Sequence, residues 1–393
     1  MRFELGHTAT PMTPKNFSEY YHVSSGAMRS EGTDHSRRNF LAALSALGAG
    51  VILAKYPFPA RAAANPGRID IHHHFQPDVY FAFQKAHGKG FDKNYWILAK
   101  DLEDMDQAGT AVAFLSLTTP GFAFGEMNEV RRVSRGCNEA AAKLVADHPR
   151  RFGSFATIPL ADTDGALKET EHALDTLKAD GISLFSNYGD TWLGHATFAP
   201  VYEELNRRKA IVYVHPVLAN CCANLSVASD GVPNEIAMIE FGADTTRALA
   251  SLIFSGMTTK FPDITWIFAH GGGTMPFLIE RFFQGGAAAE IVPGIRTKGQ
   301  AEPPVRNPRS GEDVLGELRK CYYDTAQISN PVALGALRKV IPVSQILYGT
   351  DYWYRTAVES VEGLNTSKVF KAEELRAINR GNAERILPHY RAP

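Results

Sequence analysis

Eight short β-rich runs alternate with helix-like patterns along the chain, and this alternation restricts the fold more than any other feature. The first run begins at residue 68, and the others cover residues 111–117, 152–158, 181–185, 210–214, 265–269, 321–324 and 345–349. Apolar residues at helical spacing lie between them, over residues 126–148, 164–178, 198–208 and 239–256, and again over 372–378 and 383–387. Uninterrupted apolar runs such as 210–214 are typical of parallel strands buried on both faces. The pattern predicts an α/β fold, a TIM-type (β/α)8 barrel.

The first 64 residues are expected to be a leader. Residues 36–41 contain paired arginines, residues 40–53 are apolar, and residues 62–64 offer a small-residue cleavage site before Asn65. The arginine pair resembles a twin-arginine signal, which implies export in the folded state to the periplasm or the medium. The apolar run is shorter than the about 20 residues that span a membrane, so we expect no membrane association after cleavage, an uncleaved anchor being the alternative. Translation could start at Met1 or at Met28.

Composition supports one large globular domain over residues 65–393. The chain has 393 residues, of which 45% are hydrophobic and 21% charged, and its formal net charge is −1. A balance this neutral argues against nucleic acid or an acidic membrane surface as a partner. The four cysteines form no C-x-x-C pair, which excludes a disulfide scaffold and a cysteine-built zinc site. The glycine- and proline-rich stretch 284–311 is expected to be a long loop or an association arm.

The first candidate strand runs directly into three consecutive histidines. Side chains alternate along a strand, so His72 and His74 face one side and His73 the other. Two imidazoles on one face can both bind one metal ion, and histidine is a common ligand of zinc and similar metals. The alternatives are a chance histidine run or a solvated strand end.

Three more polar residues follow the ends of other candidate strands. His215 follows the fifth, His270 the sixth and Asp351 the eighth. The carboxyl ends of the strands form the catalytic face of this fold, so we expect these side chains to converge with His72 and His74. The three glycines after His270 let the chain turn sharply and hold that histidine at the rim.

These motifs resemble those of a known family. Asp70-x-His72-x-His74, His215-Pro, His270-Gly-Gly-Gly and Gly-Thr-Asp351 are similar to the motifs of the amidohydrolase superfamily. More narrowly, they resemble the branch of aminocarboxymuconate semialdehyde decarboxylase, whose members mostly perform non-oxidative decarboxylations. Residues 116–121, 186–194 and 244–247 look closest to the 6-methylsalicylate decarboxylase group.

The resemblance implies a metal centre. It makes His72, His74, His215 and Asp351 the metal ligands, and His270 the base that orients or deprotonates a metal-bound water. Residues 186–188 stand where dinuclear relatives carry a bridging carboxylated lysine, so a single divalent ion is expected. Retention of His72 favours zinc over manganese, and no organic cofactor is expected.

The resemblance also predicts the reaction. The chain is expected to be a carbon–carbon lyase that decarboxylates a small aromatic or unsaturated carboxylic acid, possibly an ortho-hydroxybenzoate such as 6-methylsalicylate. Asp351 is the candidate acid for the ring carbon, assisted by His270; in a water-first route His270 would instead activate water for addition to the substrate. In the enzyme that typifies this branch, an arginine just before the second strand holds a second substrate carboxylate. The matching region here, residues 100–105, contains no arginine, which argues against a dicarboxylate substrate.

Two other function classes stay open at this point. One is a metal-dependent hydrolase of an ester, lactone or amide, and the other is a non-catalytic binding protein on a barrel scaffold. Expected substrate contacts are Phe122, Asn187, Tyr188 and Trp192, with ordinary packing as their alternative. A homo-oligomer, dimer or tetramer, is expected.

Overall fold

The computed structural model describes residues 67–220, 236–287 and 310–391, which lie in one compact unit, Ala63–Pro393. The expected leader and most of the expected loop 284–311 fall outside these residues. Among the described helices, none is both long and apolar enough to cross a membrane.

Eight parallel strands follow one another around a barrel in chain order. They are β1 (Arg68–His74), β2 (Thr110–Ser116), β3 (Phe152–Thr157), β4 (Gly181–Phe185), β7 (Ile211–His215), β8 (Thr265–Phe268), β9 (Tyr322–Asp324) and β10 (Ile346–Leu347). The ring is nearly closed, because Ile71 N donates to Tyr348 O over 3.0 Å and His73 pairs with Tyr352. The predicted (β/α)8 barrel is confirmed. The last strand is shorter than the predicted 345–349, because Gln345 belongs to a 3-10 turn.

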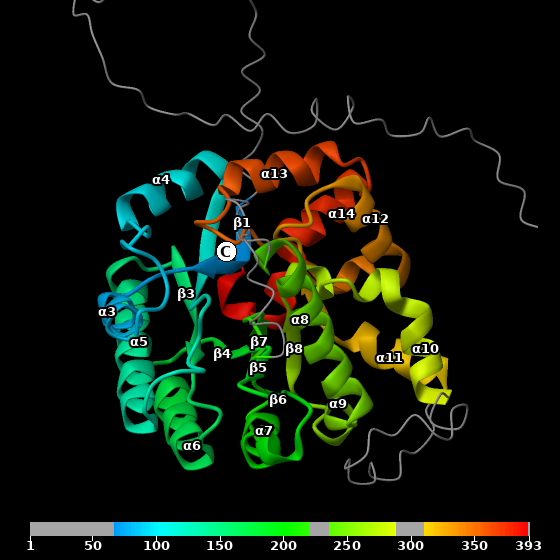
Figure 1. Ribbon diagram of the computed structural model, residues 1–393. Helices are drawn as coiled ribbons and strands as arrows, with labels where there is room; N and C mark the ends of the chain where they lie inside the picture. Colours follow the sequence, from blue (N-terminus) through cyan, green and yellow to red (C-terminus); the bar gives the residue numbers. More distant parts are fainter. Residues whose placement is uncertain (1–66, 221–235, 288–309, 392–393) are drawn as a thin grey trace, which may run out of the picture. The chain divides into compact units, whose positions relative to one another are not determined.

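Helices surround the strands (Figure 1). Those that match predicted helical patterns are α5 (Met127–Asp147), α6 (Thr163–Glu171), α7 (Ala199–Arg207), α8 (Ile236–Phe254), α14 (Ala372–Arg376) and α15 (Asn382–Ile386). The pattern over 164–178 is divided, since α6 ends at Glu171 and a π-helical turn continues to Thr176. A two-stranded hairpin, β5 (Asn187–Tyr188) and β6 (Thr191–Trp192), follows β4.

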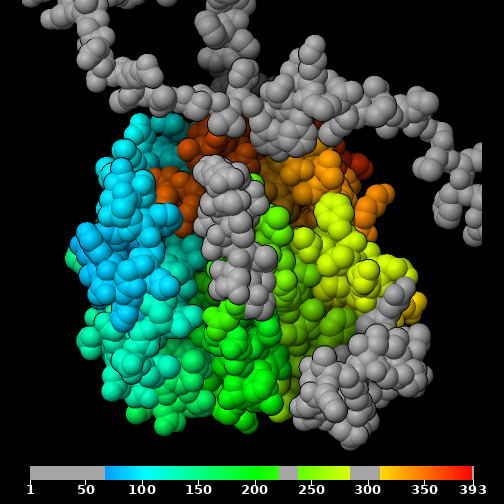
Figure 2. Space-filling view, in the orientation of Figure 1, coloured from blue at the N-terminus to red at the C-terminus, as the bar shows by residue number. Residues whose placement is uncertain are grey.

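Several helices were not predicted from the sequence. These are α3 (Asp78–Ala86), α4 (Leu98–Ala108), α9 (Met257–Lys260), α10 (Ile279–Ala287), α11 (Gly311–Lys320), α12 (Pro331–Val340) and α13 (Ala357–Thr366). α10 and α11 occupy the two edges of the stretch that was expected to be a loop. α4 and α13 are neighbours although they are far apart in the chain, as the cyan and orange segments of Figure 2 show. Asp104 of α4 accepts a hydrogen bond from Ala357 N at the start of α13, over 2.7 Å.

The two ends of the barrel differ in chemistry. The C-terminal residues cover the end at which the strands begin: Tyr390 donates to Asp180, just before β4, and its ring packs on Phe114. A hydrophobic cluster from the strands, including Phe155, Tyr213 and Ile267, lies above it. Burial of this apolar surface stabilises the barrel. The polar residues described below lie at the opposite end, where the strands end.

Candidate metal centre

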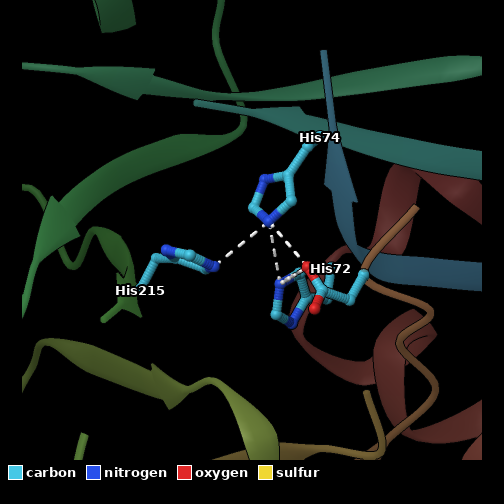
Figure 3. Close-up of side chains that lie close together, drawn as sticks. His72, His74 and His215 are labelled. Atoms are coloured by element: carbon cyan, nitrogen blue, oxygen red, sulfur yellow. Dashed lines mark hydrogen bonds and ion pairs between the residues drawn. The ribbon is translucent and has the colours of Figure 1, made fainter. Parts of the chain in front are cut away.

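Four side chains from three parts of the barrel meet at its carboxyl end. His72 and His74 end β1, His215 ends β7, and Asp351 follows β10. His74 Nε2 lies 3.1 Å from His72 Nε2, 3.1 Å from His215 Nε2 and 3.0 Å from Asp351 Oδ1. All four residues are buried. Figure 3 shows the three imidazoles turning ring nitrogens toward one point. We call these residues the four-residue cluster.

Hydrogen bonds orient the imidazoles so that lone pairs face this point. His72 Nδ1 is 2.9 Å from Asp324 Oδ2, and His74 Nδ1 is 3.3 Å from Ser116 O. Both partners are acceptors, so each Nδ1 carries the hydrogen and each neutral ring presents an Nε2 lone pair. Lone pairs and a carboxylate oxygen at this separation repel one another unless a cation lies between them.

The distances match those around a single metal ion. Donor atoms bound at about 2.1 Å and separated by angles of about 90–110° lie about 3.0–3.4 Å apart. Four of the six separations between the donor atoms are 3.0–3.2 Å, and all six are within 4.8 Å. Asp351 Oδ1, which also lies 3.2 Å from His72 Nε2, has no hydrogen-bond partner within the described part of the chain. The cluster therefore fits one divalent metal ion.

Electrostatics keep two of the donors in their metal-binding forms. Burial alone would raise the pKa of Asp351, but positive charge at His72 in the metal-free cluster outweighs burial and holds this pKa well below its usual range. A bound metal ion would supply positive charge at the same place, with His72 neutral. Burial and the neighbouring rings of His74 and His72 hold the pKa of His215 well below its usual value. Asp351 is therefore a carboxylate and His215 a neutral imidazole at neutral pH.

Asp324 is a part of the site that was not predicted from the sequence. Its Oδ2 accepts from His72 Nδ1 and, over 3.4 Å, from the Tyr213 hydroxyl. Its Oδ1 accepts from the backbone amides of His270 and Ala326, over 2.9 and 3.0 Å. One buried carboxylate thus orients both His72 and the turn that carries His270. The available signal was its position at the end of the seventh predicted strand.

His270 lies beside the four-residue cluster. Its ring centroid is 4.9 Å from that of His72 and 5.8 Å from that of His215. Its Nδ1 is 3.2 Å from Ala326 O, so Nδ1 carries the hydrogen and Nε2 has a free lone pair. Burial lowers the pKa of His270, so the ring is neutral at neutral pH. A neutral imidazole in this position can accept a proton or a hydrogen bond.

His73 faces away from the cluster, as the alternation predicts. Its Nδ1 is 3.0 Å from Asp70 Oδ2 and its Nε2 2.8 Å from Asp101 Oδ1 on α4. Burial disfavours the charged ring, but the two carboxylates outweigh it and raise the pKa of His73 to about 10. The ring stacks on Tyr352 with 4.8 Å between centroids. His73 is thus a buried cation that joins β1 to a helix.

The four expected substrate contacts are packed within the protein. Phe122 and Tyr188 have ring contacts with Phe185, and Trp192 packs against the hydrophobic core. Asn187 Nδ2 donates to Val217 O over 2.9 Å, while its buried Oδ1 has no partner in the described ranges. Their role in substrate binding stays a prediction.

Two aromatic residues that were not predicted lie closer to the cluster. The rings of Trp353 and Tyr354 are 6.4 and 6.1 Å from that of His74. The Thr118 hydroxyl after β2 is 3.3 Å from the Tyr354 hydroxyl. Tyr354 therefore reaches from the β10 loop past β1 to the end of β2, and it forms an aromatic wall above His74. The one available signal was its position just after Asp351.

Comparison with known proteins shows similarity to the amidohydrolase family and to decarboxylases. The amidohydrolase family model matches residues 69–389. The 6-methylsalicylic acid decarboxylase of Penicillium expansum is 35% identical over 293 residues, covering 72% of this chain and 84% of the relative. The 2-amino-3-carboxymuconate-6-semialdehyde decarboxylase of Dictyostelium discoideum is 23% identical and covers 82% of this chain and 85% of the relative.

Solved structures share the barrel. The dihydroxybenzoic acid decarboxylase of Polaromonas, solved with bound manganese and the inhibitor 2-nitroresorcinol, has a TM-score of 0.68 at 21% identity. The match covers 83% of this chain and 98% of that one.

Proposed function

This chain belongs to the amidohydrolase family and is a metal-dependent decarboxylase of aromatic carboxylic acids, and we propose that its substrate is a 2-hydroxybenzoate, with 2-hydroxy-6-methylbenzoate as the first candidate. The family match over residues 69–389 and the 35% identity to 6-methylsalicylic acid decarboxylase support this choice. The observation that carries the mechanism is the convergence of four metal-binding donors with His270 beside them. The hydrolase alternative is not favoured, because the similar proteins are named decarboxylases.

His72, His74, His215 and Asp351 would hold the metal. A bound divalent ion supplies positive charge that attracts the carboxylate and the ortho-hydroxyl of the substrate and stabilises negative charge on them. Asp324 keeps the His72 lone pair directed at the site. Trp353 and Tyr354 would lie against the substrate ring and exclude water from one side.

Asp351 and His270 would handle the proton. In this proposal His270 Nε2 takes the proton of the ortho-hydroxyl and passes it to Asp351, which delivers it to the ring carbon that carries the carboxylate. The carbon–carbon bond then breaks, its electron pair returns to the ring, and carbon dioxide leaves. The phenol oxygen recovers a proton from water, so the reaction consumes one proton overall. The low pKa of Asp351 makes its protonated form a strong acid, which suits transfer to a weakly basic carbon.

We propose zinc as the metal. Three of the four donors are imidazoles, a ligand type that suits zinc. Manganese is the alternative, since the Polaromonas decarboxylase was solved with manganese. Elemental analysis of protein purified without added metal tests this choice, and a stoichiometric manganese content would contradict it.

We also propose that residues 1–64 direct export and are removed, and that the mature protein forms a dimer or tetramer. The paired arginines and the small residues at 62–64 support the first proposal. The intact mass of protein from the periplasmic fraction tests the cleavage near residue 64. Light scattering of the purified protein tests the oligomer.

A substrate panel tests the proposed substrate class. The panel compares 2-hydroxy-6-methylbenzoate, 2-hydroxybenzoate, 4-hydroxybenzoate and 5-carboxyvanillate as substrates of the metal-loaded protein. We expect the highest kcat/KM for 2-hydroxy-6-methylbenzoate and no turnover of 4-hydroxybenzoate, which lacks the ortho-hydroxyl. Turnover of 4-hydroxybenzoate at the same rate as 2-hydroxy-6-methylbenzoate would contradict the proposal.

A further inference from the structure

Three non-glycine residues with left-handed backbone follow three consecutive strands at the site. They are His270 after β8 (φ 53°), Gln327 after β9 (φ 58°) and Asp351 after β10 (φ 66°). Positive φ is uncommon for residues other than glycine, and such strained positions gather at functional sites. His270 and Asp351 already belong to the site. Gln327 shares their conformation but has no assigned role.

The side chain of Gln327 contacts the site directly. Its Nε2 donates a hydrogen bond to Asp351 Oδ2 over 3.0 Å. The residue itself is exposed at the carboxyl end of the barrel, whereas Asp351 is buried. Gln327 therefore reaches Asp351 from the solvent side.

The two oxygens of Asp351 consequently have different surroundings. Oδ1 lies 3.0–3.2 Å from the Nε2 atoms of His74 and His72, on the metal side. Oδ2 faces the opposite way and is held by the Gln327 amide. Rotation about the Cβ–Cγ bond would exchange or tilt the two oxygens, and the Gln327 hydrogen bond opposes that rotation.

The segment that carries Gln327 is itself fixed by the site. Ala326, the preceding residue, donates its amide to Asp324 and accepts from His270 Nδ1. A shift of Gln327 would therefore disturb groups that orient His72 and His270. The side-chain amide of Gln327 is uncharged, so it orients Asp351 without offsetting the negative charge of the carboxylate.

We propose that Gln327 is a positioning residue, which holds Asp351 Oδ2 in the orientation from which this carboxyl group delivers its proton to the substrate ring carbon. The inference rests on the proposed function, in which Asp351 is the acid. The proton leaves Asp351 Oδ2 and bonds to the carbon that loses carbon dioxide, and Asp351 ends the step as a carboxylate.

Kinetics of Gln327→Met test the proposal, because methionine has a similar length but no N–H donor. We expect kcat to fall about tenfold, the size of losing one hydrogen bond to a charged group, with KM and metal content unchanged. Gln107→Met is the matched control. Gln107 is also exposed and donates to a carboxylate, Glu103, over 3.2 Å on α4, so its loss is expected to leave kcat unchanged.

Hydrogen exchange into the product isolates the proton transfer. In D2O the metal-loaded enzyme should introduce deuterium into 3-methylphenol at the carbon between the hydroxyl and the methyl group. NMR measures the rate of this incorporation. We expect Gln327→Met to slow this exchange by the same factor as kcat. Gln327→Ala, measured in parallel, should behave like Gln327→Met and covers the case in which the methionine variant does not fold.

The outcomes separate this inference from the proposed function. Wild-type rates of both reactions in Gln327→Met would overturn the inference while leaving the decarboxylase intact. Loss of metal from this variant would also overturn it, since Gln327 would then support metal binding and not proton delivery. Failure of the wild-type enzyme to decarboxylate any acid would instead overturn the proposed function.

Discussion

His72 donates its Nδ1 hydrogen to Asp324 Oδ2 over 2.9 Å, and both side chains are completely buried. The bond joins β1 to β9, two strands that are not neighbours in the barrel. It fixes the His72 tautomer, and through Asp324 Oδ1 it links this ring to the backbone of His270. The geometry of the four-residue cluster therefore depends on a carboxylate that lies outside it.

Replacing this carboxylate should weaken metal binding. Asp324→Asn removes the negative charge that raises the basicity of His72, and we expect the metal affinity to fall about 10–100-fold. Competition with a chelator measures this affinity. Asp180→Asn is the control, because Asp180 pairs with His389 over 2.7 Å at the opposite end of the barrel. Equal metal affinity in the wild type and Asp324→Asn would show that Asp324 does not support the centre.

His270 should be needed for turnover but not for metal binding. It lies beside the four-residue cluster without belonging to it. We expect His270→Gln to lower kcat by about 10²-fold or more, the usual contribution of a general acid–base group, with full metal content. Steady-state kinetics and elemental analysis of the same preparation measure both quantities. Loss of the metal together with activity would place His270 among the ligands and contradict this assignment.

His73 should contribute to stability in a pH-dependent way. His73→Phe keeps a ring beside Tyr352 but leaves Asp70 and Asp101 without their cation, and we expect a loss of about 3–5 kcal/mol in the free energy of unfolding. The folded pKa of His73, about 10, lies above its ordinary value of 6.5, so the stabilisation is complete below pH 6.5 and is lost as pH rises through 10.

Denaturant unfolding at pH 6, 8 and 10 measures this effect. The difference between the wild type and His73→Phe should be largest at pH 6 and smallest at pH 10. A difference that is constant or grows with pH would contradict the assignment of His73 as a buried cation.

The strands and the residues of the four-residue cluster could be predicted because their signals are local. A run such as residues 210–214 is apolar throughout, and the strand it predicts ends one residue later, at His215. His72 and His74 follow from alternation alone, since a strand needs no distant contact to place them on one face. The convergence of His215 and Asp351 then follows from the geometry of the barrel.

The features that were missed depend on distant partners. α4 looks polar because of Asp101, Glu103, Asp104 and Asp106, yet Asp101 is buried against His73. The role of Asp324 depends on His72, which is 252 residues away in the chain. Tyr354 reaches the site because the β10 loop bends toward Thr118, 236 residues earlier, and no local pattern predicts that course. Periodicity cannot reveal such pairings.

Removal of the metal should abolish activity reversibly. The cluster brings three imidazoles and a carboxylate within 4.8 Å of one another, and bound metal offsets their mutual repulsion. We expect dialysis against a chelator to eliminate turnover and lower the melting temperature, and one equivalent of a divalent metal to restore both. A need for two equivalents would contradict a mononuclear centre.

Release of carbon dioxide from carboxyl-labelled 2-hydroxy-6-methylbenzoate, by metal-loaded wild type and by His72→Ala, tests the decarboxylase and its metal centre together. We expect equal amounts of carbon dioxide and 3-methylphenol from the wild type, and neither product from His72→Ala, which should also fail to retain the metal. Undiminished carbon dioxide release by metal-free His72→Ala would contradict the proposed metal centre. Hydrolysis of aryl esters by a wild-type enzyme that decarboxylates none of the acids would contradict the decarboxylase.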